Sequence, residues 1–248
     1  MPIQSQPEPN RVLVTGATGR IGRAIALRLA RDGFHVTVHC RTRVAEAEAL
    51  AAEIRAMGGA ADTMAFDVTA RAEARAILEA RVEAAGPYYG IVCNAGITRD
   101  NAFPALTEQE WDLVLDTSLS GFFNVVHPLT MPMIRTRKGG RIVCIASVSG
   151  VMGNRGQVNY SAAKAGLIGA AKALAVELAG RGITVNCIAP GLIQSGMLEG
   201  LELERALQVV PMAKVGRPED VAALAGFLFS RDAGYITRQV IGVNGGMI

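Results

Sequence analysis

The amino-acid sequence predicts an α/β protein built on one doubly wound, parallel β-sheet of about seven strands, with helices on both faces. Strand-like and helix-like segments alternate along the 248 residues, an order typical of parallel strands joined by helices. The strand-like segments are short, continuous and apolar, as expected of strands covered on both faces. Neither a change of composition nor a Pro/Gly/Ser-rich linker marks a second domain, so we expect a single domain over residues 11–248.

Each predicted element corresponds to one segment of this alternation. The strands are expected over residues 11–15, 35–40, 61–66, 90–93, 141–146, 184–189 and 240–243. Helical patterns lie between them, near residues 20–32, 44–57, 70–85, 107–134, 158–180 and 218–230.

Two segments lie outside the alternation. Residues 1–10 read MPIQSQPEPN; they lack the apolar stretch of a secretory signal and are predicted to form a flexible tail. Residues 190–217 are longer, with a short helix expected around residues 199–209. Because an irregular stretch of this length in a compact domain usually has a function, we expect residues 190–217 to form a substrate lid.

Composition and charge exclude several classes of protein. Half of the residues are apolar, 19% are charged and the net charge is +3, which argues against disorder and against a nucleic-acid partner. The most apolar long stretch, residues 158–178, contains three charged residues, so no membrane span is expected. The four cysteines form no CxxC pair and are predicted to be buried, reduced thiols of a cytoplasmic protein: Cys40, Cys93, Cys144 and Cys187.

Residues 16–22 read GATGRIG and join the first strand to the first helix. Gly16 permits a tight turn, Gly19 lets a pyrophosphate approach the backbone, and Gly22 lets the helix pack closely on the sheet. The N-terminus of the helix then faces the phosphates. At the first strand–helix junction, this loop predicts a Rossmann-type dinucleotide site; a simple strand–helix turn is the alternative.

The ends of the second and third strands are expected to lie beside the adenosine. An acidic residue after the second strand would bind the ribose hydroxyls of NAD, but the sequence VHCRTR places Arg41 and Arg43 there. Arginine favours a 2′-phosphate and hence NADP(H), and Arg20 could join the same site; a solvated basic turn is the alternative. Asp67 and Val68 could border the adenine, although Asp67 could equally be a helix N-cap.

The stretch NYSAAKAG places Tyr160 and Lys164 one helical turn apart, on the same face. A tyrosine titrates near pH 10, and a nearby ammonium would lower that pKa by favouring the phenolate. Such a pair can act as a general acid/base on a carbonyl or alcohol. Ser147, at the end of the fifth strand, could hydrogen-bond the same substrate oxygen.

Together these residues resemble the short-chain dehydrogenase/reductase family, and within it the β-ketoacyl-acyl-carrier-protein reductases. The resemblance runs from about Val12 to the C-terminus. It rests on the glycine loop, Ser147, NAGITRD (94–100), GNRGQVNYSAAKAGLIG (153–169), RGITVNCIAPGLI (181–193) and VNGGM (243–247). Tyr160 and Lys164 alone are a weak signal; the combination in this order and spacing is strong.

The resemblance implies a role for each matching residue. Tyr160 would protonate the keto oxygen as NADPH delivers hydride, Lys164 would bind the nicotinamide ribose and lower the pKa of Tyr160, and Ser147 would orient the carbonyl. Other residues would contact the cofactor: Gly16, Thr18, Gly19, Arg20, Ile21, Gly22, Arg41, Asp67, Val68, Asn94, Ala95, Gly96, Pro190, Gly191, Ile193 and Ser195.

The resemblance also implies partners. Lys138 and Arg181 match basic positions that dock the acidic acyl-carrier protein, although each alone could be a solvated charge. The family commonly forms tetramers, so we expect a homotetramer or a hetero-oligomer with a related subunit. The small-residue helix at 158–180 and the apolar C-terminal strand fit such contacts.

Two positions depart from the family pattern. The family has a glycine where this chain has Arg20, and an asparagine where it has Ser118. That asparagine supports a water and proton relay behind the lysine, so Ser118 joins the candidate catalytic residues. Our hypothesis is that the relay continues through an extra water, with lower efficiency.

Competing functions are weaker. A serine hydrolase would need GxSxG and a histidine after the serine, and Ser147 has neither. The sequence has no metal-binding motif such as HExxH. Two alternatives stay open: a reductase of another ketone, such as a steroid, sugar or xenobiotic, and a non-catalytic NADP-binding sensor or partner subunit.

Overall fold

A computed structural model of the chain describes residues 9–194, 204 and 207–248. Within this part, seven parallel strands form one sheet in the order β3-β2-β1-β4-β5-β6-β7, which confirms the predicted fold class. The strands are β1 (Arg11–Val14), β2 (His35–Cys40), β3 (Ala60–Ala65), β4 (Gly90–Cys93), β5 (Gly140–Ile145), β6 (Ile183–Pro190) and β7 (Val240–Val243).

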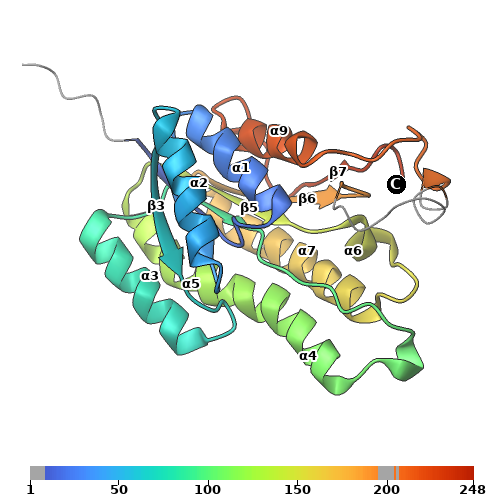
Figure 1. Cartoon of the computed structure of the whole chain (residues 1–248). Helices are drawn as coiled ribbons and strands as arrows, with labels where there is room; N and C mark the ends of the chain where they lie inside the picture. Colours follow the sequence, from blue (N-terminus) through green and yellow to red (C-terminus); the bar gives the residue numbers. More distant parts are fainter. Residues whose placement is uncertain (1–8, 195–203, 205–206) are drawn as a thin grey trace, which may run out of the picture.

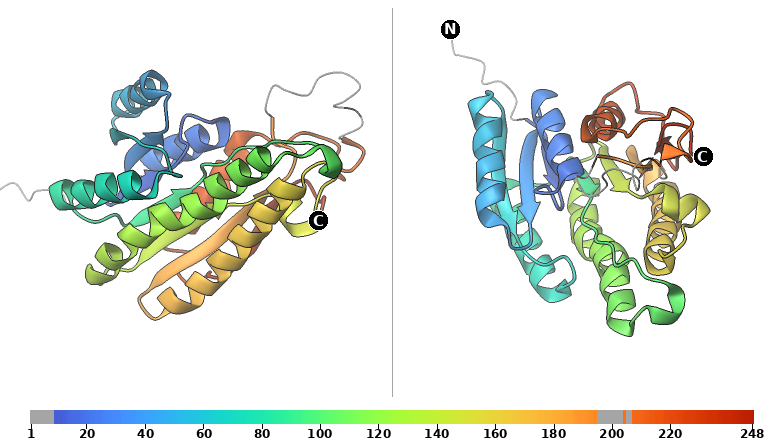
Figure 2. Two further views of the ribbon diagram at one scale, coloured as in Figure 1. Left: turned by 90° about the horizontal axis from the view of Figure 1, so that it is seen from below. Right: turned by 45° about the vertical axis from the view of Figure 1, so that its right-hand side comes forward.

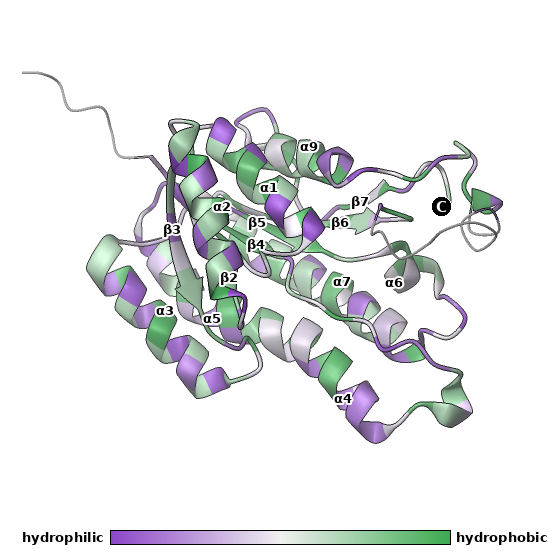
Figure 3. Ribbon diagram, viewed as in Figure 1, coloured by the Kyte–Doolittle hydropathy of each residue, from purple (hydrophilic) through white to green (hydrophobic). Residues whose placement is uncertain are grey.

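Helices cover both faces of the sheet (Figure 1). One face packs against α1 (Arg20–Arg31), α2 (Val44–Ala56) and α9 (Pro218–Phe229). The other packs against α3 (Arg71–Ala85), α5 (Gly121–Arg135) and α7 (Val158–Ala179). Side views show the sheet between these two layers (Figure 2). The central strands are hydrophobic along their length, whereas the outer helices carry hydrophilic residues (Figure 3), so burial from both sides explains the continuous apolar runs.

The predicted helix near residues 107–134 has a more complex form. The 3-10 helix η1 (Phe103–Ala105) precedes α4 (Glu108–Leu115), which begins with a capping box between Thr107 and Glu110. A π-helical turn, η2 (Asp116–Ser120), then joins α4 to α5. A short helix missing from the prediction, α6 (Val148–Met152), follows β5. π-Helical turns are frequent at functional sites, and this one contains Ser118.

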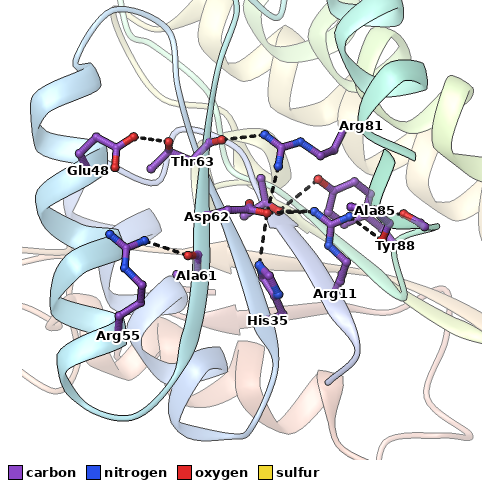
Figure 4. A network of polar contacts seen from close by, with 12 residues as sticks. Arg11, His35, Glu48, Arg55, Ala61, Asp62, Thr63, Arg81, Ala85 and Tyr88 are labelled. Atoms are coloured by element: carbon purple, nitrogen blue, oxygen red, sulfur yellow. Dashed lines mark hydrogen bonds and ion pairs between the residues drawn. The ribbon is translucent and has the colours of Figure 1, made fainter. Parts of the chain in front are cut away.

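The amino ends of the first three strands are joined by a polar network (Figure 4). The Asp62 carboxylate accepts hydrogen bonds from Arg11 and Arg81, both at 3.1 Å. The Tyr88 hydroxyl donates to Thr37 at 3.1 Å, beneath the Arg11 guanidinium. Burial raises the pKa of Asp62, but hydrogen bonds and the two guanidinium groups outweigh it and hold that pKa below its usual value.

The four cysteines are free and buried, as predicted. Three of them occupy neighbouring strands in one row, because Cys144 on β5 pairs in register with Cys93 on β4 and with Cys187 on β6. The hydrogen bond with Cys144 and burial raise the pKa of Cys187. In Cys144 the contact with Cys187 lowers the pKa, but Cys93 and burial outweigh it and the net shift is upward. These three thiols are therefore neutral, apolar side chains of the core and not a reactive thiol site.

Two predicted segments fall partly outside the described residues. Of the predicted tail, only residues 9 and 10 are described, and both are exposed. Of the predicted lid, residues 190–194, 204 and 207–217 are described. The candidate cofactor residue Ser195 and most of the expected short helix lie outside them.

Candidate active site

The candidate site lies at the carboxyl ends of the strands, where the strand order reverses between β1 and β4. The chain places β2 and β3 on one side of β1 and returns to form β4 on the other side, so the loops after β1 and β4 diverge. In open parallel sheets this switch point is the place where ligands bind.

The glycine loop fits a phosphate-binding turn. Gly16 has a φ of +60°, which favours glycine. Gly19 is the N-cap of α1 and has no side chain to cap the helix, and the first turn of α1 carries no acidic residue. The backbone N–H groups of that first turn are therefore free to bind an anion. A Cβ atom on Gly22 would lie only 2.4 Å from the carbonyl oxygen of Gly16. The loop is thus closed too tightly for a side chain, as a pyrophosphate cradle requires.

A hub of Thr15 and Asn94 connects this loop to β4. The Asn94 amide donates to the carbonyl oxygens of Thr15 at 2.9 Å and Gly16 at 3.0 Å. In return, the Thr15 hydroxyl accepts from the backbone N–H groups of Asn94 and Ala95, both at 3.0 Å. The predicted cofactor residues after β1 and β4 therefore form one hydrogen-bonded unit.

His39 supports the same loop and was not among the predicted site residues. Its Nδ1 accepts from the Gly16 N–H at 3.2 Å, and its Nε2 lies 3.0 Å from the Phe66 carbonyl oxygen. Burial lowers the pKa of His39 to about 4, so the ring is neutral near pH 7 and Nε2–H is the donor. A polar residue inside an apolar strand was the signal available in the sequence.

The adenosine end is basic and exposed. Arg20 is exposed at the start of α1, and Arg41, also exposed, lies 3.7 Å from Asp67. The N-cap alternative for Asp67 is wrong, because the N-cap of α3 is Ala70. Asp67 instead accepts from the backbone and hydroxyl of Thr69 at 2.9 and 2.8 Å. This turn fixes the Oδ1 atom of Asp67, and the Oδ2 atom faces Arg41.

Ser147 and Lys164 come together beyond the end of β5. Ser147 is the N-cap of α6, and its Oγ accepts from the Ser149 N–H at 3.1 Å. The buried Lys164 Nζ donates to the Ile145 carbonyl oxygen at 2.8 Å and lies 5.5 Å from the centroid of the Tyr160 ring. A Cβ atom on Gly96 would approach Nζ to 3.2 Å. The loop after β4 therefore also borders the lysine.

The electrostatics of this group differ from the prediction. Burial raises the pKa of Tyr160, with an opposing contribution from its hydrogen bond to Ser147 and a further increase from Asp100. Burial also lowers the pKa of Lys164 to about 8. The expected lowering of the Tyr160 pKa by Lys164 is thus wrong for this structure, because desolvation of the phenol dominates and the ammonium is directed to Ile145.

Ser118 makes no hydrogen bond to Ser147, Tyr160 or Lys164. Its hydroxyl is buried, and it has no hydrogen-bond partner among the described residues. It lines a small cavity of about 10 Å³ together with Thr15, Cys93 and Ala95, which is near the minimum for one water molecule. The cavity agrees with a shorter side chain at a position where the family has asparagine; the relay through Ser118 stays a hypothesis.

The remaining predicted cofactor residues follow β6. Pro190 is the last residue of β6, and the Gly191 N–H donates to the carbonyl oxygen of Val243 at 3.0 Å. A Cβ atom on Gly191 would lie 2.7 Å from the Asn244 side chain. Ile193 forms a parallel bridge with Gly216. The VNGGM stretch thereby fixes the path of the chain beyond β6.

Lys138 and Arg181 lie at the opposite end of the sheet. Lys138 precedes β5 and Arg181 precedes β6, and the two loops are joined by the Gly140 N–H and Gly182 carbonyl at 3.3 Å. The structure brings these two basic residues together, but not close to Ser147, which follows β5. Tyr160 and Arg181 are separated by the whole of α7, a distance of about 30 Å along its axis.

The fold and this group of residues define the family. The chain belongs to the short-chain dehydrogenase family, whose members use a nicotinamide cofactor: residues 10–206 match it. Among its relatives is the 3-oxoacyl-(acyl-carrier-protein) reductase FabG of Aggregatibacter actinomycetemcomitans, 60% identical over 237 residues, or 95% of this chain and 98% of that protein. The 3-oxoacyl-(acyl-carrier-protein) reductase FabG of Staphylococcus aureus strain Mu50 is 47% identical over 238 residues, which are 95% of this chain and 96% of that protein. A 3-oxoacyl-(acyl-carrier-protein) reductase of Synechocystis is 43% identical over 237 residues, with the same coverage. The predicted family and the oxidoreductase class are confirmed.

In residues 9–194, 204 and 207–248 no group of three His, Cys, Asp or Glu residues could hold a metal ion. No helix of the described part of the chain is long and apolar enough to cross a membrane.

Proposed function

We propose that the protein reduces a 3-oxoacyl thioester carried by acyl-carrier protein to the 3-hydroxyacyl thioester, with NADPH as the reductant, in fatty-acid or polyketide/aryl-polyene-like chain elongation. The observation that carries the proposal is the grouping of Ser147, Tyr160 and Lys164 beside the loop after β4. This loop and the glycine loop border the switch-point crevice, which is the expected place of the ligand in such a sheet. The relatives named as 3-oxoacyl-(acyl-carrier-protein) reductases support the choice of substrate.

Each residue of this group has one task in the reaction. Bound NADPH supplies the hydride. Tyr160 donates its phenolic proton to the keto oxygen; a phenol is protonated at neutral pH already at its ordinary pKa, and this is the form required for reduction. Ser147 hydrogen-bonds the same oxygen and fixes its direction. Lys164, with one N–H directed to Ile145, has its remaining donors for the hydroxyls of the nicotinamide ribose.

The choice of NADPH over NADH rests on Arg41 and Arg20. Both are exposed at the adenosine end of the crevice, where a guanidinium can bind a 2′-phosphate in a bidentate manner. Asp67 limits the freedom of Arg41 through the 3.7 Å ion pair. The Thr69 turn holds the carboxylate in place, so Asp67 and Val68 would border the adenine.

Lys138 and Arg181 are proposed to dock the acidic carrier protein, and the protein is proposed to be a cytoplasmic homotetramer. Because these residues lie at the amino end of the sheet, a carrier bound there would face away from the crevice of the same chain. Docking would therefore serve the crevice of a neighbouring subunit. Reversing both charges should raise KM for the carrier-bound thioester while leaving KM for a small thioester unchanged.

The test is NADPH consumption with acetoacetyl-acyl-carrier protein, comparing wild type with Tyr160→Phe. Turnover that falls by about a hundredfold or more in the variant, with NADPH binding preserved, supports both the reaction and the acid. Turnover of a steroid, sugar or xenobiotic ketone, without turnover of the thioester, would show that the substrate is a ketone of that class. NADPH binding without turnover on any of these ketones would favour a sensor or partner subunit, the reading motivated by Arg20 and Ser118.

A further inference from the structure

Two loops that border the candidate site are held together by two hydrogen bonds, and a third joins the first loop to α7. One loop, residues 94–101, follows β4, and the other, residues 153–157, joins α6 to α7. The Asn101 N–H donates to the Gly156 carbonyl at 2.8 Å, and the Gln157 amide donates to the Asp100 carboxylate at 2.7 Å. The buried Asn159, next to Tyr160, donates to the Arg99 carbonyl at 3.0 Å.

Gln157 also connects this contact to Ser147. Its Oε1 accepts from the Ser149 hydroxyl at 2.8 Å and from the Asn154 amide at 3.0 Å. The backbone N–H of the same Ser149 donates to the Oγ of Ser147. Because a carboxylate only accepts, Asp100 determines which end of the Gln157 amide faces Ser149. Hydrogen bonds through Gln157, and through the hydroxyl and backbone N–H of Ser149, therefore link Asp100 to the Ser147 hydroxyl.

Asp100 also acts on Tyr160 through its charge. The carboxylate raises the pKa of the phenol, whereas the hydrogen bond from Ser147 opposes the rise. The two ends of this link thus influence the same hydroxyl in opposite directions.

We propose that Asp100 and Gln157 are positioning residues for the reduction: they clamp the 94–101 loop to the α6–α7 loop and so hold the Ser147 and Tyr160 hydroxyls in the arrangement that binds the keto oxygen. The proposal rests on the proposed reductase function. The residues do not touch the reacting atoms; they act through Ser149 and through the start of α7. Asp100 is exposed and Gln157 is half-buried, and a hydrogen bond contributes about 1 kcal/mol to stability, so its loss should affect catalysis more than folding.

Reciprocal substitutions test this arrangement. Asp100→Asn keeps an acceptor for the Gln157 amide but removes the charge. Gln157→Glu places two carboxylates face to face. The double variant Asp100→Asn/Gln157→Glu restores one donor, one acceptor and one negative charge, with the roles exchanged. Asp112→Asn, which removes an exposed carboxylate from α4, is the matched control.

Two readouts are needed. Tyrosine labelled with ¹³C at Cζ reports the ionisation of Tyr160 by NMR without any substrate, with Tyr160→Phe to assign the signal. We expect the titration midpoint to fall in Asp100→Asn, to rise in Gln157→Glu and to return towards wild type in the double variant. The kcat for acetoacetyl-acyl-carrier protein should fall about tenfold in Gln157→Glu and recover in the double variant, with thermal unfolding unchanged.

The outcomes separate this proposal from the proposed function. If wild type does not reduce the thioester, the proposed function fails, and the midpoints alone decide the clamp. Midpoints in Gln157→Glu and Asp100→Asn equal to that of the Asp112→Asn control would overturn the clamp. So would a double variant that stays folded but recovers neither the midpoint nor, in an active enzyme, the kcat.

Discussion

Replacing Gly22 by alanine adds a single methyl group, and this group should disrupt the dinucleotide-binding loop. The added Cβ would lie 2.4 Å from the Gly16 carbonyl oxygen, 2.6 Å from the Asn94 amide nitrogen and 2.9 Å from the Ala17 Cα. Two of these three neighbours are backbone atoms, so they cannot rotate away.

The expected size of the effect follows from these contacts. Forcing a methyl group into a packed site costs about 1–3 kcal/mol. Loss of the two Asn94 hydrogen bonds adds about 1 kcal/mol each, and the better helix propensity of alanine returns about 1 kcal/mol. The free energy of unfolding should therefore fall by about 2–4 kcal/mol. The Kd for NADPH should rise about tenfold or more, because the loop can no longer close around the phosphates.

The assay combines urea unfolding with a fluorescence titration of NADPH. Gly169→Ala is the matched control, since Gly169 lies in α7 with open space around the position of a Cβ atom, and alanine there should be neutral or stabilising by up to about 1 kcal/mol. A Gly22→Ala variant that unfolds and binds NADPH like Gly169→Ala would refute the proposed cradle.

Three other substitutions test separate parts of the structure. Ser118→Asn should raise turnover by about two- to tenfold if a relay passes this position; unchanged steady-state turnover would disprove the relay. Arg41→Asp should raise KM for NADPH about tenfold while lowering that for NADH, and equal changes for both cofactors would contradict a 2′-phosphate site. Asp62→Asn should lower the free energy of unfolding at pH 7 by about 2 kcal/mol. Because the folded pKa of Asp62 is depressed, its contribution is complete above the unfolded pKa and is lost as the pH falls through the folded pKa. Urea unfolding of both proteins should therefore show a smaller difference at pH 3 than at pH 7, and a difference that does not shrink would contradict the assignment.

The sheet could be predicted from the sequence because most strands are apolar runs bounded by polar or glycine residues; β3 is the exception, since it carries Asp62 and Thr63. The ends of the strands differ from the prediction by about one residue; β1 ends at Val14 because Thr15 turns its hydroxyl into the hub with Asn94. The break between α4 and α5 could not be predicted, since the π-helical turn around Ser118 leaves no distinct pattern in the residues.

The chemistry of the site was predictable in its residue types and less so in its energetics. The pair of Tyr160 and Lys164 is visible as a spacing, but their pKa values depend on burial, which tertiary packing decides. Gln157 and Asp100 lie 57 residues apart in the chain, so only the fold shows that they meet. The same holds for His39, whose ring reaches the glycine loop across the sheet.

The hub of Thr15 and Asn94 has a consequence for how quickly the crevice can be filled. The hub joins the two loops that diverge at the switch point, and opening them would break four hydrogen bonds at once. The phosphate end of the crevice is therefore already in its binding shape before a dinucleotide arrives. Association at this end should proceed in a single step, without a preceding rearrangement of the loops. Differences in affinity among dinucleotides should therefore lie mainly in their dissociation rates.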